Sequence, residues 1–162
     1  SINSSYNFRS GFLEQTLVMA QIAKKIAPYF KLDKDLAIGG ILLIKIGVIK
    51  QIKSGYISEH SKEGYLLGQT ILGRDILNTA IKRLKHFPED LKIKLEHIMI
   101  SHENNYQPNT SYRPSFPEAL FVHYIYKMDF NMKLMEQIIL DDSGENEFTT
   151  THNHFRLPIL KE

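Results

Sequence analysis

The side chains best suited to chemistry are a histidine and a glutamate that are adjacent late in an expected helix. His102 and Glu103 offer an imidazole nitrogen and a carboxylate, which are common ligands of Zn²⁺, Mn²⁺ and related ions. A metal-dependent hydrolase uses such an ion to make hydroxide from water and to stabilise a phosphoryl transition state. One histidine and one glutamate do not complete such a site, so donors from other helices would have to converge on them.

Two further features bear on metal chemistry. Lys45 lies inside the apolar run LAIGGILLIKIGVI, and its ammonium group would repel a divalent ion. In the simplest interpretation this lysine extends along the helix surface to reach solvent. His152 and His154 are two residues apart, a spacing that resembles a metal clip, but in a non-helical tail we expect them to be surface residues.

The segments that position these residues are expected to be helical. In the first segment, apolar residues recur at steps of three and four, which predicts one buried helical face. Asp33 can cap a second helix through LAIGGILLIKIGVI, where Gly39 and Gly40 indicate close helix packing. The residues of the expected face of the first helix are Leu13, Leu17, Ala20, Ala23 and Ala27.

Three more helices are expected beyond a polar loop at 53–64. The third runs over about 61–85, the fourth begins near Pro88, and the last covers 118–140. A proline-rich loop over 104–117 separates the last two. One side of the third helix is formed by Leu66, Thr70, Gly73, Leu77, Ile81 and Leu84, and Phe148 and Phe155 could hold the tail on the body. The pattern contains no strand alternation, and the predicted class is all-α.

Composition limits the architecture more than the function. The 162 residues are 43% hydrophobic and 23% charged, which suits one globular domain over 1–162. We expect residues 1–10 to form an N-terminal extension and 141–162 a C-terminal tail packed on the body. A formal charge of +2 does not by itself indicate nucleic acid. There is no cysteine, no signal-peptide pattern and no apolar run long enough to cross a membrane, so we expect a cytoplasmic protein.

Several segments together resemble the HD domain of YhaM-type 3′-5′ exoribonucleases, within the HD phosphohydrolase superfamily. They are GFLEQT, GILLIKIGVI, GYISEHSKEGYLLGQTILG, HIMISHEN and RPSFPEALFVHYIYKMD, and the third is the most diagnostic. The resemblance covers nearly the whole chain. It implies an HD-domain helical bundle, in which ligands from several helices would hold one or two divalent metals.

The resemblance also implies where metal ligands should stand, and most of them are replaced. A histidine is expected at positions 15, 44, 69, 102 and 103, and an aspartate at 45 and 126. Only the histidine at 102 keeps its type. The former metal-site positions are therefore Gln15, Ile44, Lys45, Gln69, His102, Glu103 and Tyr126. We predict no catalytic residue, no metal and no other cofactor in this chain.

A second interpretation of Lys45 follows from this pattern. Lys45 and Glu103 occupy ligand positions of one site, and a buried charge must be paired or neutralised. We therefore predict that the Lys45 ammonium lies within salt-bridge distance of Glu103, or failing that of Glu14, with Gln15 or Tyr126 completing its hydrogen bonds. His102 is then expected to be a hydrogen-bonded core histidine.

The leading functional hypothesis is a catalytically inactive HD-like domain that serves as a structural, interaction or ligand-binding module. Its partner could be a second copy or an active relative, and no membrane is expected. One alternative is a residual metal-dependent hydrolase that uses His102 and Glu103. Another is a nucleotide or RNA sensor, in which Lys45 and His102 contact phosphate. Residues that could contact RNA are Lys24, Lys25, Lys31, Lys34, Lys82, Arg83, Lys85, Tyr106, Tyr112 and Phe116.

Overall fold

The computed structural model describes residues 11–53, 59–103 and 112–161, and this part of the chain is mostly helical. The predicted all-α class is confirmed. The elements in chain order are α1 (Gly11–Ile26), the 3₁₀ turn η1 (Ala27–Phe30), α2 (Lys34–Leu43), α3 (Val48–Gln51), β1 (Ile52–Lys53), β2 (Glu59–His60), α4 (Lys62–Ile81), α5 (Glu89–Ser101) and α6 (Pro117–Asp141).

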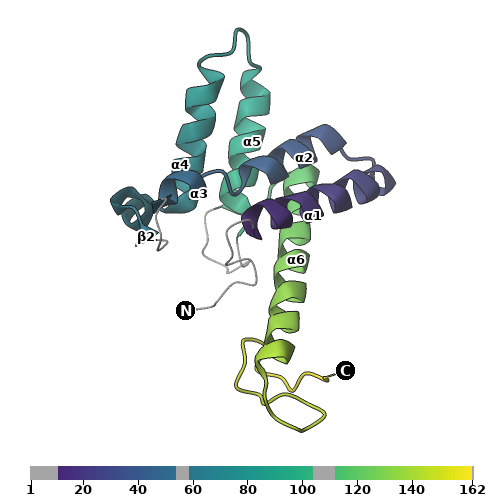
Figure 1. The fold of residues 1–162 in the computed structure, drawn as a ribbon. Helices are drawn as coiled ribbons and strands as arrows, with labels where there is room; N and C mark the ends of the chain where they lie inside the picture. Colours follow the sequence, from purple (N-terminus) through teal and green to yellow (C-terminus); the bar gives the residue numbers. More distant parts are fainter. Residues whose placement is uncertain (1–10, 54–58, 104–111, 162) are drawn as a thin grey trace.

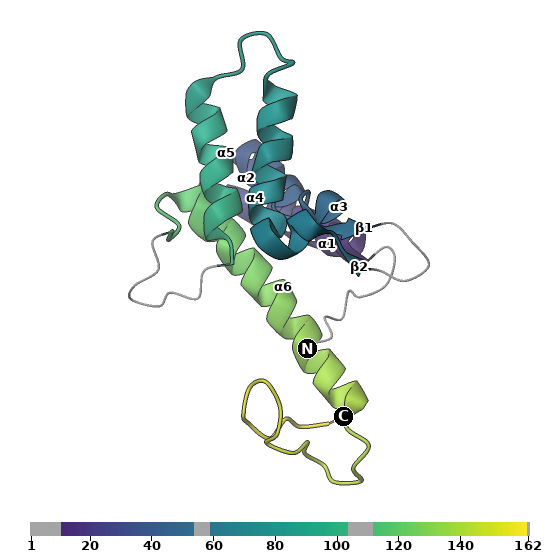
Figure 2. The same cartoon turned by 90° about the vertical axis from the view of Figure 1, so that its left-hand side faces the viewer.

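The helices are arranged around α6, which is the longest of them (Figure 1). Helices α1 and α2 lie across the first half of α6, and α5 packs against α2 and α6. Helices α4 and α5 stand side by side as a hairpin, as both views show (Figure 2). The second half of α6 extends beyond the bundle and leads into the C-terminal tail. No helix in the described ranges is long and apolar enough to cross a membrane.

The core lies where α1, α2, α5 and α6 meet. Its fully buried side chains include Met19, Ile41, Ile98 and Val122. The backbones of α2 and α5 approach closely at Gly40, where a Cβ would lie 2.8 Å from Ile98 Cγ2. The expectation that this glycine serves close helix packing is therefore confirmed.

The predicted buried face of the first helix is confirmed at Ala23 and Ala27 but not in the first half of α1. The helix buries Gln15, Met19 and Ala23, which are four residues apart, whereas Leu13 and Leu17 are exposed. A spacing of four keeps residues on one face of a helix as well as the predicted pattern does. The structure selects the face with a polar residue because Gln15 finds a hydrogen-bond partner on α6, so its burial leaves no unsatisfied group.

The second expected helix is divided in two. Asp33 caps α2 as predicted, since its Oδ1 accepts hydrogen bonds from the backbone N–H groups of Asp35 and Leu36. The helix ends at Leu43, and a turn over 44–47 leads into the short α3. Lys45 therefore lies in a turn between two helices, which frees its side chain from the apolar face on which the sequence placed it.

Helix α4 is shorter and less regular than predicted. It ends at Ile81, and Gly68 breaks it with φ 71° and ψ 168°, a conformation that only glycine adopts readily. The apolar side expected over 61–85 is confirmed only in its middle, where Gly73 and Leu77 are buried, whereas Leu66 and Leu84 at its ends are exposed. The break reorients the chain immediately before Gln69.

The ends of the last two helices agree closely with the predicted ones. Helices α5 and α6 begin and end within one or two residues of the predicted positions. The expected loop at 53–64 contains an unpredicted antiparallel pairing of β1 with β2, with Ile52 opposite His60.

The C-terminal tail is held by Lys161, whose Nζ lies 2.7 Å from Asp142 Oδ1, and by the buried side chains of Thr149 and Ile159, while Phe148 is about half exposed. Residues 104–111, including Tyr106, lie outside the described ranges.

Candidate functional site

A single carboxylate oxygen at the end of α5 gathers polar groups from three other parts of the fold. Glu103 Oε1 lies 2.9 Å from Lys45 Nζ, 2.8 Å from Gln69 Nε2 and 3.1 Å from the Tyr126 hydroxyl. The ammonium also donates to the Tyr126 hydroxyl at 3.2 Å and lies 4.8 Å from the centre of its ring. We call Lys45, Gln69, Glu103 and Tyr126, with the adjacent His102, the Glu103 cluster. The predicted ion pair between Lys45 and Glu103 is confirmed.

Backbone geometry explains why these groups meet. Lys45 is presented by the turn between α2 and α3, and Gln69 by the residue that follows the break at Gly68. Gly47 lets the two segments touch, because a Cβ at that position would lie 1.8 Å from the Gln69 carbonyl oxygen. Tyr126 is buried on the face of α6 that packs toward α5.

The charges of the cluster balance. Burial of the Glu103 carboxyl would raise its pKa, but the polar groups around it, including the Lys45 ammonium, outweigh burial and hold the pKa well below its usual range. Burial and the Glu103 carboxylate raise the pKa of Tyr126 well above its ordinary value. The phenol therefore stays protonated and donates to the carboxylate. One ammonium faces one carboxylate, and the other two donors are neutral.

His102 is buried and only partly satisfied. Its Nδ1 lies 2.8 Å from the carbonyl oxygen of Met99, which can only accept, so Nδ1 carries the proton. The other ring nitrogen, Nε2, lies 3.6 Å from Glu103 Oε1 and has no hydrogen-bond partner. The prediction of a hydrogen-bonded core histidine is confirmed for Nδ1, and Nε2 remains a polar atom directed toward the cluster.

Gln15 belongs to a separate pair, one turn further along α6. Its Nε2 donates to Asp129 Oδ2 at 2.9 Å, and both side chains are buried. The sequence reasoning did not select Asp129, although it stands three residues after Tyr126 and therefore on the same face of α6. That spacing was the signal that could have identified it. Ile44, the remaining former-site position, is fully buried in the apolar core.

The donor set does not suit a divalent metal. Among residues 11–53, 59–103 and 112–161, no group of three or more His, Cys, Asp or Glu side chains could hold a metal ion. The carboxylate that would serve as a ligand is already in contact with an ammonium group, which repels a second cation. Glu103 and the unpaired Nε2 of His102 are two donors, whereas a catalytic metal site typically has about three protein ligands.

The other residues that the sequence suggested for binding lie apart from the cluster. His152 and His154 are exposed in the tail. Lys82, Arg83 and Lys85 lie at the free end of the α4–α5 hairpin, and Lys24, Lys25 and Lys31 lie around the end of α1 and η1. Tyr112 is exposed, whereas Phe116 is partly buried against the core.

The chain is similar over most of its length to proteins named 3′-5′ exoribonuclease YhaM. The chain is 30% identical over 135 residues to YhaM of Bacillus subtilis strain 168, a match that covers 83% of this chain and 43% of that protein. It is 28% identical over 162 residues to YhaM of Bacillus pumilus strain SAFR-032, covering 97% of this chain and 51% of that protein.

These matches cover only part of the relatives. The chain spans about half the length of the curated relatives it matches. No family model matches it, and no solved structure matches it.

Proposed function

We propose that this chain is a catalytically inactive HD-like domain that acts as a structural, interaction or ligand-binding module. One observation carries the proposal: a lysine ammonium, a glutamine amide and a phenol all contact Glu103 Oε1. At an active metal centre a carboxylate oxygen would face the dication. Here a monovalent side-chain cation faces the carboxylate, in place of a dication that could activate a hydrolytic water.

The first experiment measures metal content and hydrolysis together. Purified protein is analysed for Mn, Fe, Ni and Zn, and is incubated with single-stranded RNA and with a model phosphodiester in the presence of each ion. We expect no stoichiometric metal and no turnover. About one metal per chain together with EDTA-sensitive hydrolysis would establish the alternative of a residual hydrolase.

A restored variant provides the positive control. Because a metal needs several ligands at once, Lys45→Asp alone should bind no metal. A variant that restores the whole expected ligand set should acquire metal binding if the cluster occupies a retired metal site. That variant combines Gln15→His, Ile44→His, Lys45→Asp, Gln69→His, Glu103→His and Tyr126→Asp.

A second candidate function is ligand sensing at the same cluster. His102 Nε2 is a buried polar atom without a partner, and the adjacent Lys45 supplies a cation. A phosphate group of a nucleotide or RNA that displaced Glu103 could contact the Lys45 ammonium, and also His102 Nε2 once the imidazole takes up a second proton. A thermal-shift panel of nucleotides tests this, because a ligand that binds only the native state raises the apparent stability. A shift that is lost in both His102→Ala and Lys45→Met would favour sensing over a purely structural role.

A further inference from the structure

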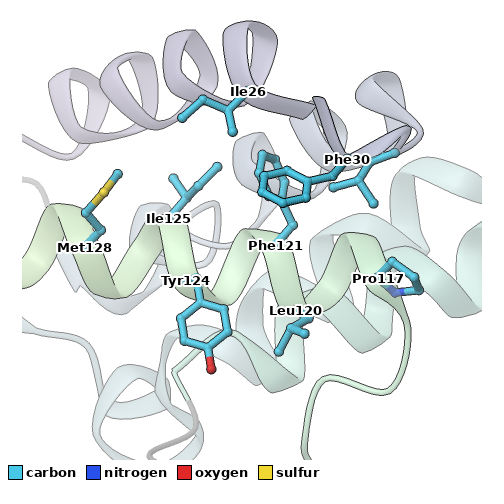
Figure 3. A pocket seen from close by; sticks show the side chains of 9 residues that line it. Ile26, Phe30, Pro117, Leu120, Phe121, Tyr124, Ile125 and Met128 are labelled. Atoms are coloured by element: carbon cyan, nitrogen blue, oxygen red, sulfur yellow. The ribbon is translucent and has the colours of Figure 1, made fainter. Parts of the chain in front are cut away.

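An apolar groove lies on α6 away from the Glu103 cluster. It has a volume of about 470 Å³ between the end of α1 with η1 on one side and the first half of α6 on the other. Figure 3 shows Ile26 and Phe30 above the groove, and Phe121, Tyr124 and Met128 on α6 below. Phe30, Tyr124 and Met128 are substantially exposed. Aromatic and methionine side chains in such a setting suit an apolar partner, because they offer a large and adaptable contact area.

The edge of this groove is basic. Lys25 precedes the lining residue Ile26, and Lys31 stands between the lining residues Phe30 and Leu32. Both lysines are exposed, and neither forms an ion pair with another residue in the described ranges.

The carboxylates at the same edge are already engaged. Glu118 Oε1 accepts a hydrogen bond from the Asp33 backbone N–H, and Asp33 caps α2. These two carboxylates keep their negative charge, so the edge of the groove carries both signs, and Lys25 and Lys31 are exposed cations there that form no ion pair within the described ranges.

The opposite end of α6 has the complementary character. Residues 134–155 contain no lysine or arginine, and their carboxylates are Glu136, Asp141, Asp142, Glu145 and Glu147. Glu145 and Glu147 are exposed and form no ion pair with a described residue. Leu140, Phe148, Leu157 and Leu160 are each about half exposed or more in the same region. We call 140–160 the tail surface; it carries the carboxylates Asp141, Asp142, Glu145 and Glu147 and one exposed cation, Arg156.

The groove and the tail surface of one molecule cannot meet. Met128 and Asp141 are 13 residues apart on one helix, or ~20 Å at 1.5 Å per residue. Figures 1 and 2 both place the tail beyond the end of α6 that extends out of the helical bundle. A contact between these surfaces therefore requires two molecules.

We propose that the tail surface of one copy docks in the groove of a second copy. The exposed apolar side chains of the tail would cover the groove floor, and Glu145 and Glu147 would face Lys25 and Lys31. Because the two surfaces differ, the contact is head-to-tail and generates a ring or an open chain of copies. The proposal is independent of whether the Glu103 cluster is catalytic, since neither surface includes a residue of that cluster.

Charge reversal tests the proposal by sedimentation of the 162-residue chain over a range of concentrations. The groove variant combines Lys25→Glu with Lys31→Glu, and the tail variant combines Glu145→Lys with Glu147→Lys. Each variant alone should associate at least about tenfold more weakly than the original chain, because like charges then face one another. An equimolar mixture of the two variants should regain association, because every contact between unlike variants is again between opposite charges.

A matched control reverses two lysines elsewhere. Lys82→Glu with Lys85→Glu changes the same number of charges at the tip of the α4–α5 hairpin and should leave association unchanged. Circular dichroism melting verifies that each variant is folded. The proposal is overturned if the original chain is monomeric at all concentrations, if either the groove or the tail reversal has no effect, or if the mixture fails to reassociate. A groove-to-groove dimer would be recognised by its insensitivity to the tail reversal.

Discussion

The Glu103 cluster and the apolar groove both use α6, but from opposite sides and in different ways. Tyr126 faces the cluster and Tyr124 lines the groove, and two residues along a helix correspond to a rotation of about 200°. The cluster draws on α5, α6, the α2–α3 turn and α4, whereas the groove is formed by α6 and the segment that ends α1.

The difference concerns what each region contributes to the fold. In the cluster, a buried tyrosine and a nearly buried lysine converge on one carboxylate, so a change in one group leaves others unsatisfied. In the groove, the side chains of Phe30, Tyr124 and Met128 remain in contact with water, and removing one of them takes little away from the folded state. We therefore expect the cluster to determine stability and the groove to be available for association.

The largest effect is expected where the backbone brings the cluster together. In Gly47→Ala the new methyl carbon would lie 1.8 Å from the Gln69 oxygen and 2.6 Å from the Gly73 nitrogen, both of which are backbone atoms. We expect a loss of about 3 kcal/mol or more in the free energy of unfolding, measured in urea.

The control for this variant is Gly39→Ala in α2. Its methyl carbon would lie 3.7 Å from Leu95 Cδ2, an ordinary contact, so alanine should be neutral or stabilise the helix by up to about 1 kcal/mol. A similar decrease in the free energy of unfolding for Gly47→Ala and Gly39→Ala would show that the close backbone approach at Gly47 does not hold the cluster together.

A smaller effect is expected at the ion pair itself. Lys45 is 10% exposed and Glu103 is 43% exposed, so the pair lies between the buried and the surface classes. A double-mutant cycle with Lys45→Met and Glu103→Gln should give a coupling energy of about 1–2 kcal/mol.

A second ion pair of similar length sharpens this test. Lys133 Nζ and Glu136 Oε2 are 2.8 Å apart on the exposed surface of α6. The equivalent cycle there should give about 0.2–0.5 kcal/mol, because both groups remain hydrated. A coupling energy below about 0.5 kcal/mol between Lys45 and Glu103 would make this pair no stronger than an exposed surface ion pair. The hypothesis that Lys45 compensates the charge of Glu103 in a former metal site would then be abandoned.

Acid should weaken the cluster selectively. Because the pKa of Glu103 is lower in the folded state than its ordinary value of 4.5, its contribution is fully present above that value and is lost as the pH falls below it. The difference in unfolding free energy between the original chain and Glu103→Gln should be constant above about pH 5 and shrink below it. After allowance for solvent screening of this partly exposed group, we expect a difference of about 1 kcal/mol at neutral pH. A difference that does not change between neutral and acidic pH would contradict the assignment.

The smallest effect is expected in the groove. Met128 is 45% exposed, so Met128→Gln should change the free energy of unfolding by no more than about 0.5 kcal/mol. Calorimetry at low protein concentration measures this without a contribution from association. A loss above about 1 kcal/mol would mean that the groove side chains support the fold directly.

The sequence by itself determined the helical class, the cap at Asp33, the extents of α5 and α6, and the pairing of Lys45 with Glu103. Local rules explain the first three, because capping and helical periodicity depend on residues close together in the chain. The ion pair was accessible because the resemblance assigned both residues to one site, and because a buried charge requires a partner.

Only the tertiary structure decided which face of α1 is buried, where the second expected helix divides, and that Gln15 pairs with Asp129. Apolar periodicity favoured Leu13 and Leu17, but a buried amide that finds a carboxylate on α6 carries no penalty for an unsatisfied group. The convergence on Glu103 Oε1 likewise depends on the turn at 44–47 and the break at Gly68. Such contacts join residues far apart in the chain, and helical periodicity, which depends on neighbouring residues, carries no information about which distant partners will meet.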